Sequence, residues 1–484
     1  MSKRSGDDRP DASRRRLLTG LAAAPALAGL AAAPGCADNR GPASSAGNGL
    51  SPAPQAPAGV ILPNPADSGI DHVVIVMMEN RSYDHFLGWV PGSDGVQAGA
   101  RYPDRKGRMV ETFHLASDAE YGYQGCGKED PDHGYDGGRV HLAGGALNGW
   151  LATVGEASVD SDKFPVGYYS REDLPFFAGC ADHYTVCDRY FHGILASTYP
   201  NRIYLHAGET DRRENTLTPS SLPTIWDRLD EKGVSGRYYF HDLPVTAFWA
   251  NKYLALSTRF EQFLLDAAAG QLANVSIVDP RFVGEAPNGV TNDDHPQADI
   301  RNGQAFLNSV YDALRNSPQW ERSLMIVVYD EWGGFYDHVT PPVGPVTEAE
   351  KALPNDGRLG FRVPAVILGP RARRNHVSHL QFDVNSVLNL LRWRWDLGPL
   401  GARSDWSLNM AYALDFSGAP KTEAPAFEVP LGPFGADCMT GIPVPFPNFP
   451  GSFSAMTAAQ IKQAQHNLEW IGLREMARAH GFEV

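Results

Sequence analysis

Short, continuous apolar runs are the feature of this sequence that most restricts its fold. The first run, at 71–78, is a strand-length stretch of mainly Val, Ile and Met. Because polar residues do not alternate with apolar ones inside it, the run is typical of a strand buried on both faces, as in a parallel sheet. Similar runs are found at Val275–Val278, Leu324–Tyr329 and Val363–Leu368.

Helical patterns separate these runs. Apolar residues recur at helical spacing at Ile225 and Leu229 before Gly233, at Phe260, Phe263 and Leu264 before Gly270, and at Phe306, Leu307, Val310 and Leu314. Alternating strands and helices predict an α/β fold with a mostly parallel central sheet covered by helices on both faces. In such sheets the ligand site lies beyond the carboxyl ends of the strands.

The amino-terminal segment has the pattern of an export signal. Consecutive arginines at 14–16 precede an apolar stretch that continues to Ala33, so residues 1–36 predict a signal of the twin-arginine type. Cys36 follows this stretch and is a candidate for lipid attachment. We therefore expect an exported protein, either periplasmic, attached to the cell envelope or secreted.

The rest of the chain divides by composition. Residues 37–69 are rich in Ala, Pro, Gly and Ser and predict a flexible linker. Folding is expected to begin at about Ile70, and the main folded domain is predicted over 70–416. The segment 417–484 predicts a Pro-rich strap followed by a helix from Thr457 toward Gly481, both packed on the same domain.

Charge and cysteine content exclude some classes of protein. The chain has 484 residues and a formal net charge of −14, the opposite of what binding to nucleic acid phosphates requires, so no nucleic acid partner is expected. Five cysteines are too few for a small disulfide-stapled scaffold, although they allow one or two bridges.

Acidic and amide side chains follow two of the apolar runs. Glu79 and Asn80 come directly after the first run, and Asp330 and Glu331 follow the run at 324–329. A single acid in such a place usually caps a helix, but two sets at one sheet edge would repel each other unless a cation lies between them. Oxygen ligands favour Ca²⁺, Mg²⁺ or Mn²⁺, and Zn²⁺ stays open because carboxylates also bind it.

A third segment carries a candidate nucleophile. In Ser197-Thr198-Tyr199-Pro200, the proline favours the first turn of a helix, which would place the Thr198 hydroxyl near free N–H groups. Such a place suits an anion and an oxygen nucleophile. The alternative is that Ser197 or Thr198 only caps the helix.

Five ordered motifs resemble a known family. They are Met78-Glu79-Asn80-Arg81-Ser82-Tyr83-Asp84-His85-Phe86, the stretch from Asp132-His133-Gly134 to Asn148-Gly149-Trp150, Thr198-Tyr199-Pro200-Asn201-Arg202, Asp294-His295-Pro296 and Tyr329-Asp330-Glu331-Trp332-Gly333-Gly334-Phe335-Tyr336-Asp337-His338-Val339. Over about 70–416 the chain resembles the bacterial phosphoesterase family, which contains non-specific phospholipases C and acid phosphatases.

The resemblance implies an alkaline-phosphatase-like fold and a metal-assisted phosphoryl transfer to a hydroxyl. By motif, Thr198 corresponds to the nucleophile, and the metal ligands correspond to Glu79, Asn80, Asp330 and Glu331. Histidines are kept around the phosphate at the positions of His133, His295 and His338. We expect His133 or His338 to give the proton to the departing alkoxide, because histidine titrates near neutral pH.

The expected function is that of an exported, metal-dependent phospholipase C acting on phospholipid phosphodiesters, with contact to a membrane surface. One alternative is an acid or broad-specificity phosphomonoesterase, whose substrate is a simple phosphate ester. Another is an envelope-tethered binding protein that keeps the fold without the chemistry.

Overall fold

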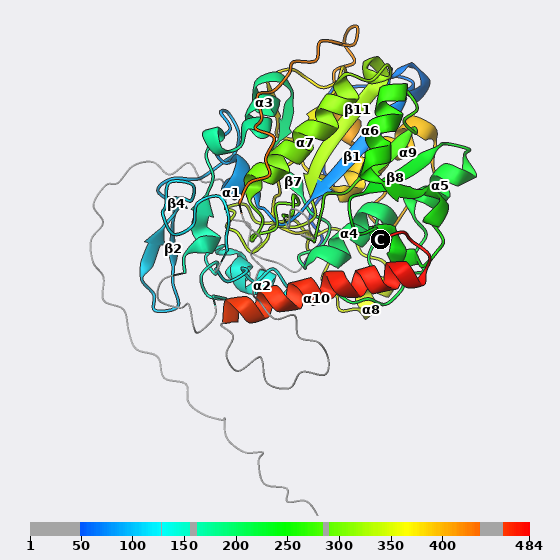
Figure 1. Cartoon of the computed structure of the whole chain (residues 1–484). Helices are drawn as coiled ribbons and strands as arrows, with labels where there is room; N and C mark the ends of the chain where they lie inside the picture. Colours follow the sequence, from blue (N-terminus) through cyan, green and yellow to red (C-terminus); the bar gives the residue numbers. More distant parts are fainter. Residues whose placement is uncertain (1–48, 127, 155–161, 284–289, 436–457) are drawn as a thin grey trace, which may run out of the picture. The chain divides into compact units, whose positions relative to one another are not determined.

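The computed structural model describes residues 49–126, 128–154, 162–283, 290–435 and 458–484 (Figure 1). The predicted export signal and Cys36 lie outside the described residues, as do parts of the predicted linker and of the Pro-rich strap. In the last helix, side chains are described from Leu468 onward.

An eight-stranded sheet forms the centre of the fold. Its strands lie in the order β13 (His376–Ser378), β6 (Thr185–Cys187), β12 (Val366–Leu368), β11 (Ser323–Tyr329), β1 (His72–Met78), β10 (Val275–Val278), β8 (Gly236–Phe240) and β9 (Ser257–Arg259). The predicted runs thus form β1, β10, β11 and β12. All of their residues are buried except His72, as a sheet covered on both faces requires.

The sheet is mostly parallel, and β12 is the exception. It pairs antiparallel with β11 and with β6, whereas the other neighbouring strands pair parallel. The connection from β11 to β12 holds only a short helix, α8 (Glu348–Ala352), in place of a crossover helix. A strand that follows without a crossover runs back antiparallel, which apolar content alone does not reveal.

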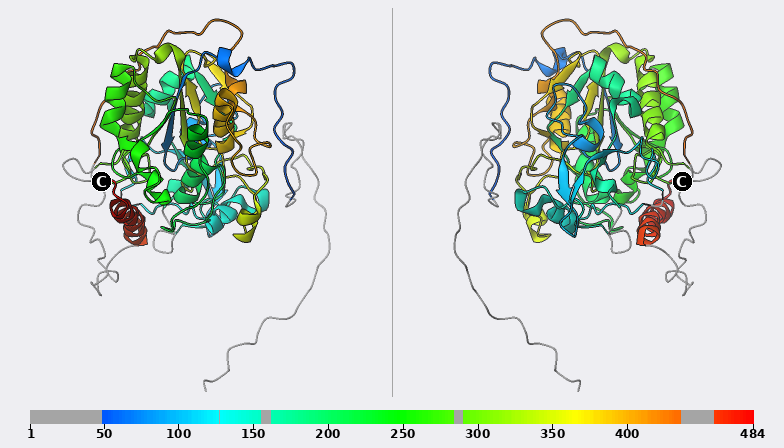
Figure 2. Two further views of the ribbon diagram at one scale, coloured as in Figure 1. Left: turned by 90° about the vertical axis from the view of Figure 1, so that its right-hand side faces the viewer. Right: turned by 90° about the vertical axis from the view of Figure 1, so that its left-hand side faces the viewer.

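Helices cover both faces of the sheet, as predicted. α3 (Pro175–His183), α6 (Phe260–Ala269) and α7 (Ile300–Arg315) pack together on one face, and α9 (Val384–Trp395) lies on the other (Figure 2). The remaining helices are α1 (Tyr83–Leu87), α2 (Tyr135–Leu142), α4 (Thr198–Ala207), α5 (Ile225–Glu231) and α10 (Ala458–Ala479). α4 contacts both α5 and α9.

Smaller elements complete the described chain. Short strands are β2 (Arg101–Pro103), β3 (Met109–Glu111), β4 (Phe113–His114), β5 (Gly167–Tyr168), β7 (Tyr190–Phe191) and β14 (Phe382–Asp383). Short 3-10 helices lie at Pro65–Asp67, Ala143–Gly145, Phe164–Val166, Arg171–Asp173, Val245–Trp249, Leu254–Leu256, Trp320–Arg322 and Met410–Ala413.

Local sequence explains where the helices begin and end. Asp299 caps α7 by accepting a hydrogen bond from the Arg301 amide, and Asp383 caps α9 in the same way through Ser386. Gly270 ends α6 with φ of 66°, a left-handed conformation that glycine adopts at low cost.

The chain before β1 is already attached to this body. The Ser51 amide donates to the Val343 carbonyl (2.8 Å), and the Trp406 indole donates to the Ser51 carbonyl (3.2 Å). Ser51, which lies in the segment predicted as a flexible linker, therefore contacts the folded body. Cys180 and Cys187 are free thiols, whereas Cys126 is disulfide-bonded.

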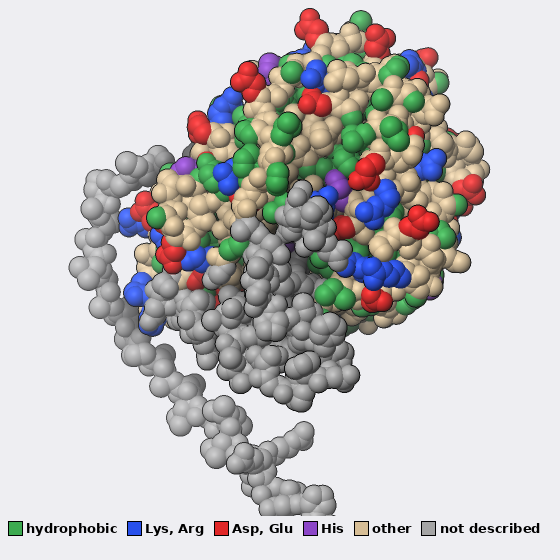
Figure 3. Space-filling view, viewed as in Figure 1, with side chains coloured by type: hydrophobic (Ala, Val, Ile, Leu, Met, Phe, Trp, Pro, Cys, Tyr) green, Lys and Arg blue, Asp and Glu red, His purple; other side chains and the backbone are tan. Residues whose placement is uncertain are grey.

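The described helices and the visible surface give two further facts. Among the described residues, none of the helices is both long enough and apolar enough to cross a membrane. On the face shown in Figure 3, acidic and basic side chains are interspersed and do not form a continuous basic stripe.

Candidate active site

Two strand ends bring the predicted ligands to one edge of the sheet. β1 and β11 pair in parallel with Met78 opposite Tyr329, and the Asp330 amide donates to the Met78 carbonyl (3.1 Å). Glu79 and Asp330 therefore leave neighbouring strands at the same level. Both side chains are fully buried, and so are those of Asn80 and Glu331.

The turn after β1 has a backbone conformation that is rare for residues other than glycine. Asn80 has φ of 61°, and its amide donates to Asp330 Oδ1 (3.3 Å). Gly333, after β11, packs so closely that a Cβ there would lie 2.1 Å from the Asn80 carbonyl oxygen. The Gly333 amide donates to Glu331 Oε2 (2.6 Å). Close packing therefore holds this strained turn in place. Strained backbone held by its surroundings is common at functional sites.

Several polar atoms of these four residues have no hydrogen-bond partner among the described residues. They are both carboxylate oxygens of Glu79, both amide atoms of Asn80, Asp330 Oδ2 and Glu331 Oε1. Buried polar atoms of this kind are costly unless a ligand satisfies them. The set is dominated by oxygen and carries negative charge, so it fits a divalent cation that prefers oxygen ligands.

Arg202 lies between three of the buried acids. Its guanidinium nitrogens are 3.2 Å from Asp330 Oδ2, 3.3 Å from Asp279 Oδ1 and 3.5 Å from Glu79 Oε1. All four side chains are at most 2% exposed. One guanidinium cannot balance three carboxylates, so this edge keeps an excess of negative charge.

Arg202 also shows where the predicted nucleophile lies. Both Thr198 and Arg202 belong to α4, and residues four apart share one face of a helix, separated by about 6 Å along its axis. Thr198 is the first residue of α4 and is 2% exposed. The structure therefore places the hydroxyl at a helix start, one turn from the side chain that contacts Glu79 and Asp330.

His133 and His295 form a second group with Asp130 beside these acids. His133 Nε2 is 4.0 Å from Glu331 Oε1, and its Nδ1 is 2.8 Å from the Pro131 carbonyl. Asp130 lies 3.8 Å from His133 Nδ1 and 3.5 Å from His295 Nε2. Ligand atoms of Asp130, His133 and His295 all lie within 4.8 Å of one another, which makes the group a second candidate for holding a metal.

The charge of the site changes how these groups titrate. Burial raises the pKa of Glu79 well above its ordinary value. The positive charge of Arg202 opposes this rise, and the negative charge of Asp330 adds to it. Burial also raises the pKa of Asp330 to about 6. For His133, burial opposes the charged form, but the carboxylates of Glu331 and Asp130 outweigh it and raise its pKa to about 9. A protonated His133 is therefore available as a proton donor near neutral pH.

His338 occupies a different environment. Its Nδ1 is 2.6 Å from Asp84 Oδ2, and its Nε2 is 3.1 Å from Asp94 Oδ1. Within the described part of the chain, it makes no hydrogen bond or ion pair with any of the four predicted metal ligands. Both ring nitrogens are committed to carboxylates, so the structure favours His133 over His338 as the proton donor.

Sequence reasoning missed three residues of this site. Asp279 directly follows the predicted run Val275–Val278, so it carries the same sequence signal as Glu79 and Asp330. Asp293 lies in loop sequence without a pattern, and the Glu79 amide donates to the Asp293 carbonyl (2.8 Å). Arg202 was visible only as part of the Thr198 motif. Its spacing of four residues from Thr198 in a predicted helix is the one signal that could have indicated a shared face.

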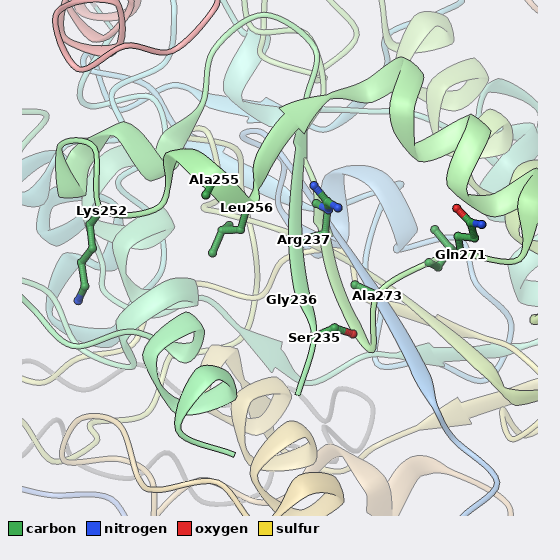
Figure 4. Close-up of a pocket in the computed structure, with 9 residues that line it drawn as sticks. Ser235, Gly236, Arg237, Lys252, Ala255, Leu256, Gln271 and Ala273 are labelled. Atoms are coloured by element: carbon green, nitrogen blue, oxygen red, sulfur yellow. The ribbon is translucent and has the colours of Figure 1, made fainter. Parts of the chain in front are cut away.

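A hollow of about 400 Å³ lies elsewhere on the molecule (Figure 4). It is lined by Ser235, Gly236, Arg237, Lys252, Ala255, Leu256, Gln271, Leu272 and Ala273. Gly236 begins β8, and Leu272 and Ala273 precede β10, so the hollow lies at the amino ends of these parallel strands. It is therefore separate from the acids at the carboxyl edge.

Sequence comparisons with known proteins identify relatives that are phospholipases C. Non-specific phospholipase C1 of Arabidopsis thaliana is 29% identical over 416 residues, which cover 77% of each chain. Phospholipase C A of Mycobacterium tuberculosis (strain ATCC 25618 / H37Rv) is 29% identical over 430 residues, which cover 75% of this chain and 80% of the relative.

Solved structures resemble the chain only distantly. The lipoteichoic acid synthase LtaP from Listeria monocytogenes has 9% identity and a TM-score of 0.35, over 76% of this chain and 80% of that one. A protein in the alkaline phosphatase superfamily from Vibrio parahaemolyticus has 10% identity and a TM-score of 0.33, over 71% and 68%. Structural similarities with such low TM-scores say nothing about the reaction.

The matching relatives are phospholipases C, so the protein is a hydrolase that cleaves phosphoester bonds. The chain belongs to the phosphoesterase family, whose model matches residues 70–398. This range agrees with the resemblance expected over 70–416, and it contains all the predicted site residues.

Proposed function

We propose that the protein is an exported, divalent-metal-dependent phospholipase C that hydrolyses phospholipid phosphodiesters through a Thr198 nucleophile. The observation that carries the proposal is the set of buried oxygens on Glu79, Asn80, Asp330 and Glu331 that accept no hydrogen bond from a described residue, beside the helix that begins at Thr198. The phospholipase C relatives, which match over about three quarters of the chain, support the substrate class.

The chain's own residues supply most of the mechanism. Glu79, Asn80, Asp330 and Glu331 would hold the cation, which when bound favours the alkoxide form of the Thr198 hydroxyl and offsets charge on a phosphate oxygen. The first turn of α4 points N–H groups toward an anion, which suits a phosphate next to Thr198.

The reaction then divides into two displacements. In the first, the Thr198 oxygen, in its alkoxide form after its proton has passed to solvent, forms a bond to phosphorus while the bond from phosphorus to the diacylglycerol oxygen breaks. His133 donates its proton to that departing alkoxide. In the second, water attacks phosphorus, His133 takes a proton from the water, and the bond from phosphorus to the Thr198 oxygen breaks, which releases the phosphorylated head group and restores the Thr198 alkoxide.

Export and membrane contact are parts of the same proposal. The arginines at 14–16 and the apolar stretch after them support export by a twin-arginine signal, and Cys36 supports a lipid anchor. Membrane contact follows from the proposed substrate, because phospholipids lie in membranes, and the phospholipase C relatives support that substrate class.

The test is the variant Thr198→Ala, assayed with phosphatidylcholine vesicles and with p-nitrophenyl phosphate, each with and without added divalent metal. We expect turnover to fall by about 10³-fold or more, because the alanine side chain has no oxygen that can attack phosphorus. The unfolding temperature should stay the same, and Thr198→Ser should keep measurable activity.

The products separate the alternatives. Phosphocholine release by the wild-type protein supports a phospholipase C, and release of inorganic phosphate alone supports a phosphomonoesterase. If neither product forms with any metal, the protein is a binding protein without this chemistry. Wild-type activity in Thr198→Ala would refute the nucleophile assignment.

A further inference from the structure

The carboxyl-terminal helix α10 is connected by hydrogen bonds to the turn that carries Thr198. Glu469 of α10 accepts a hydrogen bond from Asn215 Nδ2 through its Oε2 (2.7 Å). Asn215 Oδ1 in turn accepts from the Tyr199 amide (2.9 Å) and from the Ser197 hydroxyl (3.1 Å). Asn215 therefore holds the residues on either side of Thr198.

The direction of the Asn215 amide depends on Glu469. A carboxamide can face its neighbours with either its oxygen or its NH₂ group. Only the oxygen can accept from the Tyr199 amide, so the NH₂ group must point away from α4. An ionised Glu469 accepts and cannot donate, so it stabilises this orientation and opposes the reverse one.

Packing brings Glu469 to this position. Trp470, the next residue of α10, is 1% exposed, and its ring stacks on Phe282 at a centroid distance of 4.3 Å. It also meets the Tyr199 ring edge-on at 5.5 Å. α10 is therefore docked on the residue that follows Thr198, and in Figure 1 it runs beside α4.

We propose that Glu469 is a positioning residue that fixes the Thr198 turn through Asn215, so that α10 completes the catalytic edge. This inference rests on the proposed function of Thr198. Both Glu469 and α10 lie beyond residue 398, where the match to the family model ends, so family membership does not supply this contact. The claim concerns geometry, since Glu469 acts on the nucleophile only through another side chain.

The first test compares Glu469→Ala with a matched control on the same helix. Glu475 is an exposed residue of α10 that pairs with Arg478 (3.0 Å), so Glu475→Ala removes a carboxylate without touching α4. We expect Glu469→Ala to lower kcat by about 10- to 100-fold with KM unchanged within about twofold, because a misplaced nucleophile slows chemistry more than binding. Glu475→Ala should keep wild-type kcat.

The second test reverses the hydrogen bond. Asn215→Asp keeps the acceptor for the Tyr199 amide but turns a second carboxylate toward Glu469, and we expect kcat to fall about as far as in Glu469→Ala. Glu469→Gln alone should stay close to wild type, because its carbonyl oxygen still accepts from Asn215. In the double variant, the Gln NH₂ group can donate to the Asp carboxylate, so kcat should recover to within about threefold of wild type.

Amide hydrogen exchange gives a readout that does not need activity. Exchange at the Tyr199 amide should speed up by about tenfold in Glu469→Ala and stay slow in Glu475→Ala. Wild-type kcat and wild-type exchange at Tyr199 in Glu469→Ala, or no recovery in the double variant, would overturn the inference. A Thr198→Ala variant that is fully active would overturn the proposed function instead, while the exchange result would still decide whether Glu469 holds the turn.

Discussion

At the scale of single residues, the site is defined by buried oxygens to which no described residue donates a hydrogen bond. Glu79 and Asp330 could be predicted because each follows an unbroken apolar run, and parallel strands end at one edge. Arg202 could not be predicted in the same way. Its contacts with Asp279, Asp330 and Glu79 join a helix to three separate segments, which only the tertiary fold brings together.

Asp330→Asn tests whether these oxygens bind a cation. The substitution keeps the size of the side chain but removes one charge from the buried set, so we expect affinity for divalent metal to fall at least about tenfold, with a parallel loss of phosphodiesterase activity. Metal content after dialysis and titration calorimetry measure the effect.

Asp405→Asn is the matched control for this prediction. The Asp405 side chain is 86% exposed and pairs with Arg392 (2.8 Å), so its loss should leave metal affinity unchanged. An Asp330→Asn protein that binds metal as tightly as wild type would contradict the assignment of Asp330 as a ligand.

At the scale of elements, strands with an unbroken apolar run could be predicted, whereas short strands of mixed composition could not. β10 has the predicted bounds, and β1 and β11 differ from prediction by one residue at the start. β6 and β8 were missed because β6 has three residues and β8 reads Gly-Arg-Tyr-Tyr-Phe, which has no apolar run. Pairing with β10 and β12 places these segments in the sheet, an effect that local sequence does not encode.

The helix α10 was predictable, but its place beside the site was not. Its repeat of apolar residues indicates a helix, whereas nothing in that repeat identifies Tyr199 and Phe282 as the partners of Trp470. Trp470 and Glu469 make the contacts near Thr198, and Trp470 is the largest fully buried side chain of the helix, in which Leu473 and Ala477 are buried too. Docking of α10 should therefore depend strongly on Trp470.

Trp470→Ala tests the docking of α10. Removing a buried indole from its contacts with Phe282 and Tyr199 should lower the free energy of unfolding by about 3 kcal/mol, or detach α10 with increased proteolysis near its end. Urea denaturation and limited trypsin digestion measure the two outcomes. Leu468→Ala, at a residue that is 38% exposed, should have a much smaller effect, and equal effects of the two substitutions would contradict the docking role.

At the scale of the whole molecule, a buried ionic network ties together segments that are far apart in sequence. Arg362, just before β12, contacts Asp84 of α1 (3.0 Å) and Asp337 after β11 (3.1 Å), and these three side chains are fully buried. His338 contacts Asp84 of this network, and its other ring nitrogen contacts Asp94, whose side chain is 43% exposed. Breaking such a network leaves buried charges uncompensated, so it should be sensitive to pH.

His338 gives this network a defined pH response. Burial opposes the charged form, but the hydrogen bond and charge of Asp84 outweigh it and raise the pKa of His338 from 6.5 to about 9. A raised folded-state pKa adds stability that is fully present below pH 6.5 and is lost as the pH rises toward 9. Each tenfold change in proton affinity is worth about 1.4 kcal/mol, so the loss should reach up to about 3 kcal/mol.

Urea unfolding at intervals from pH 6 to pH 9.5 measures this loss, and His338→Gln is the comparison that isolates it. Other groups titrate in the same window, His133 among them, so the informative quantity is the difference between the two proteins. Glutamine can still donate to Asp84 but cannot gain a charge. The difference in unfolding free energy should therefore be largest at pH 6 and shrink toward pH 9.5, and parallel curves would show that His338 is not charged in the folded protein.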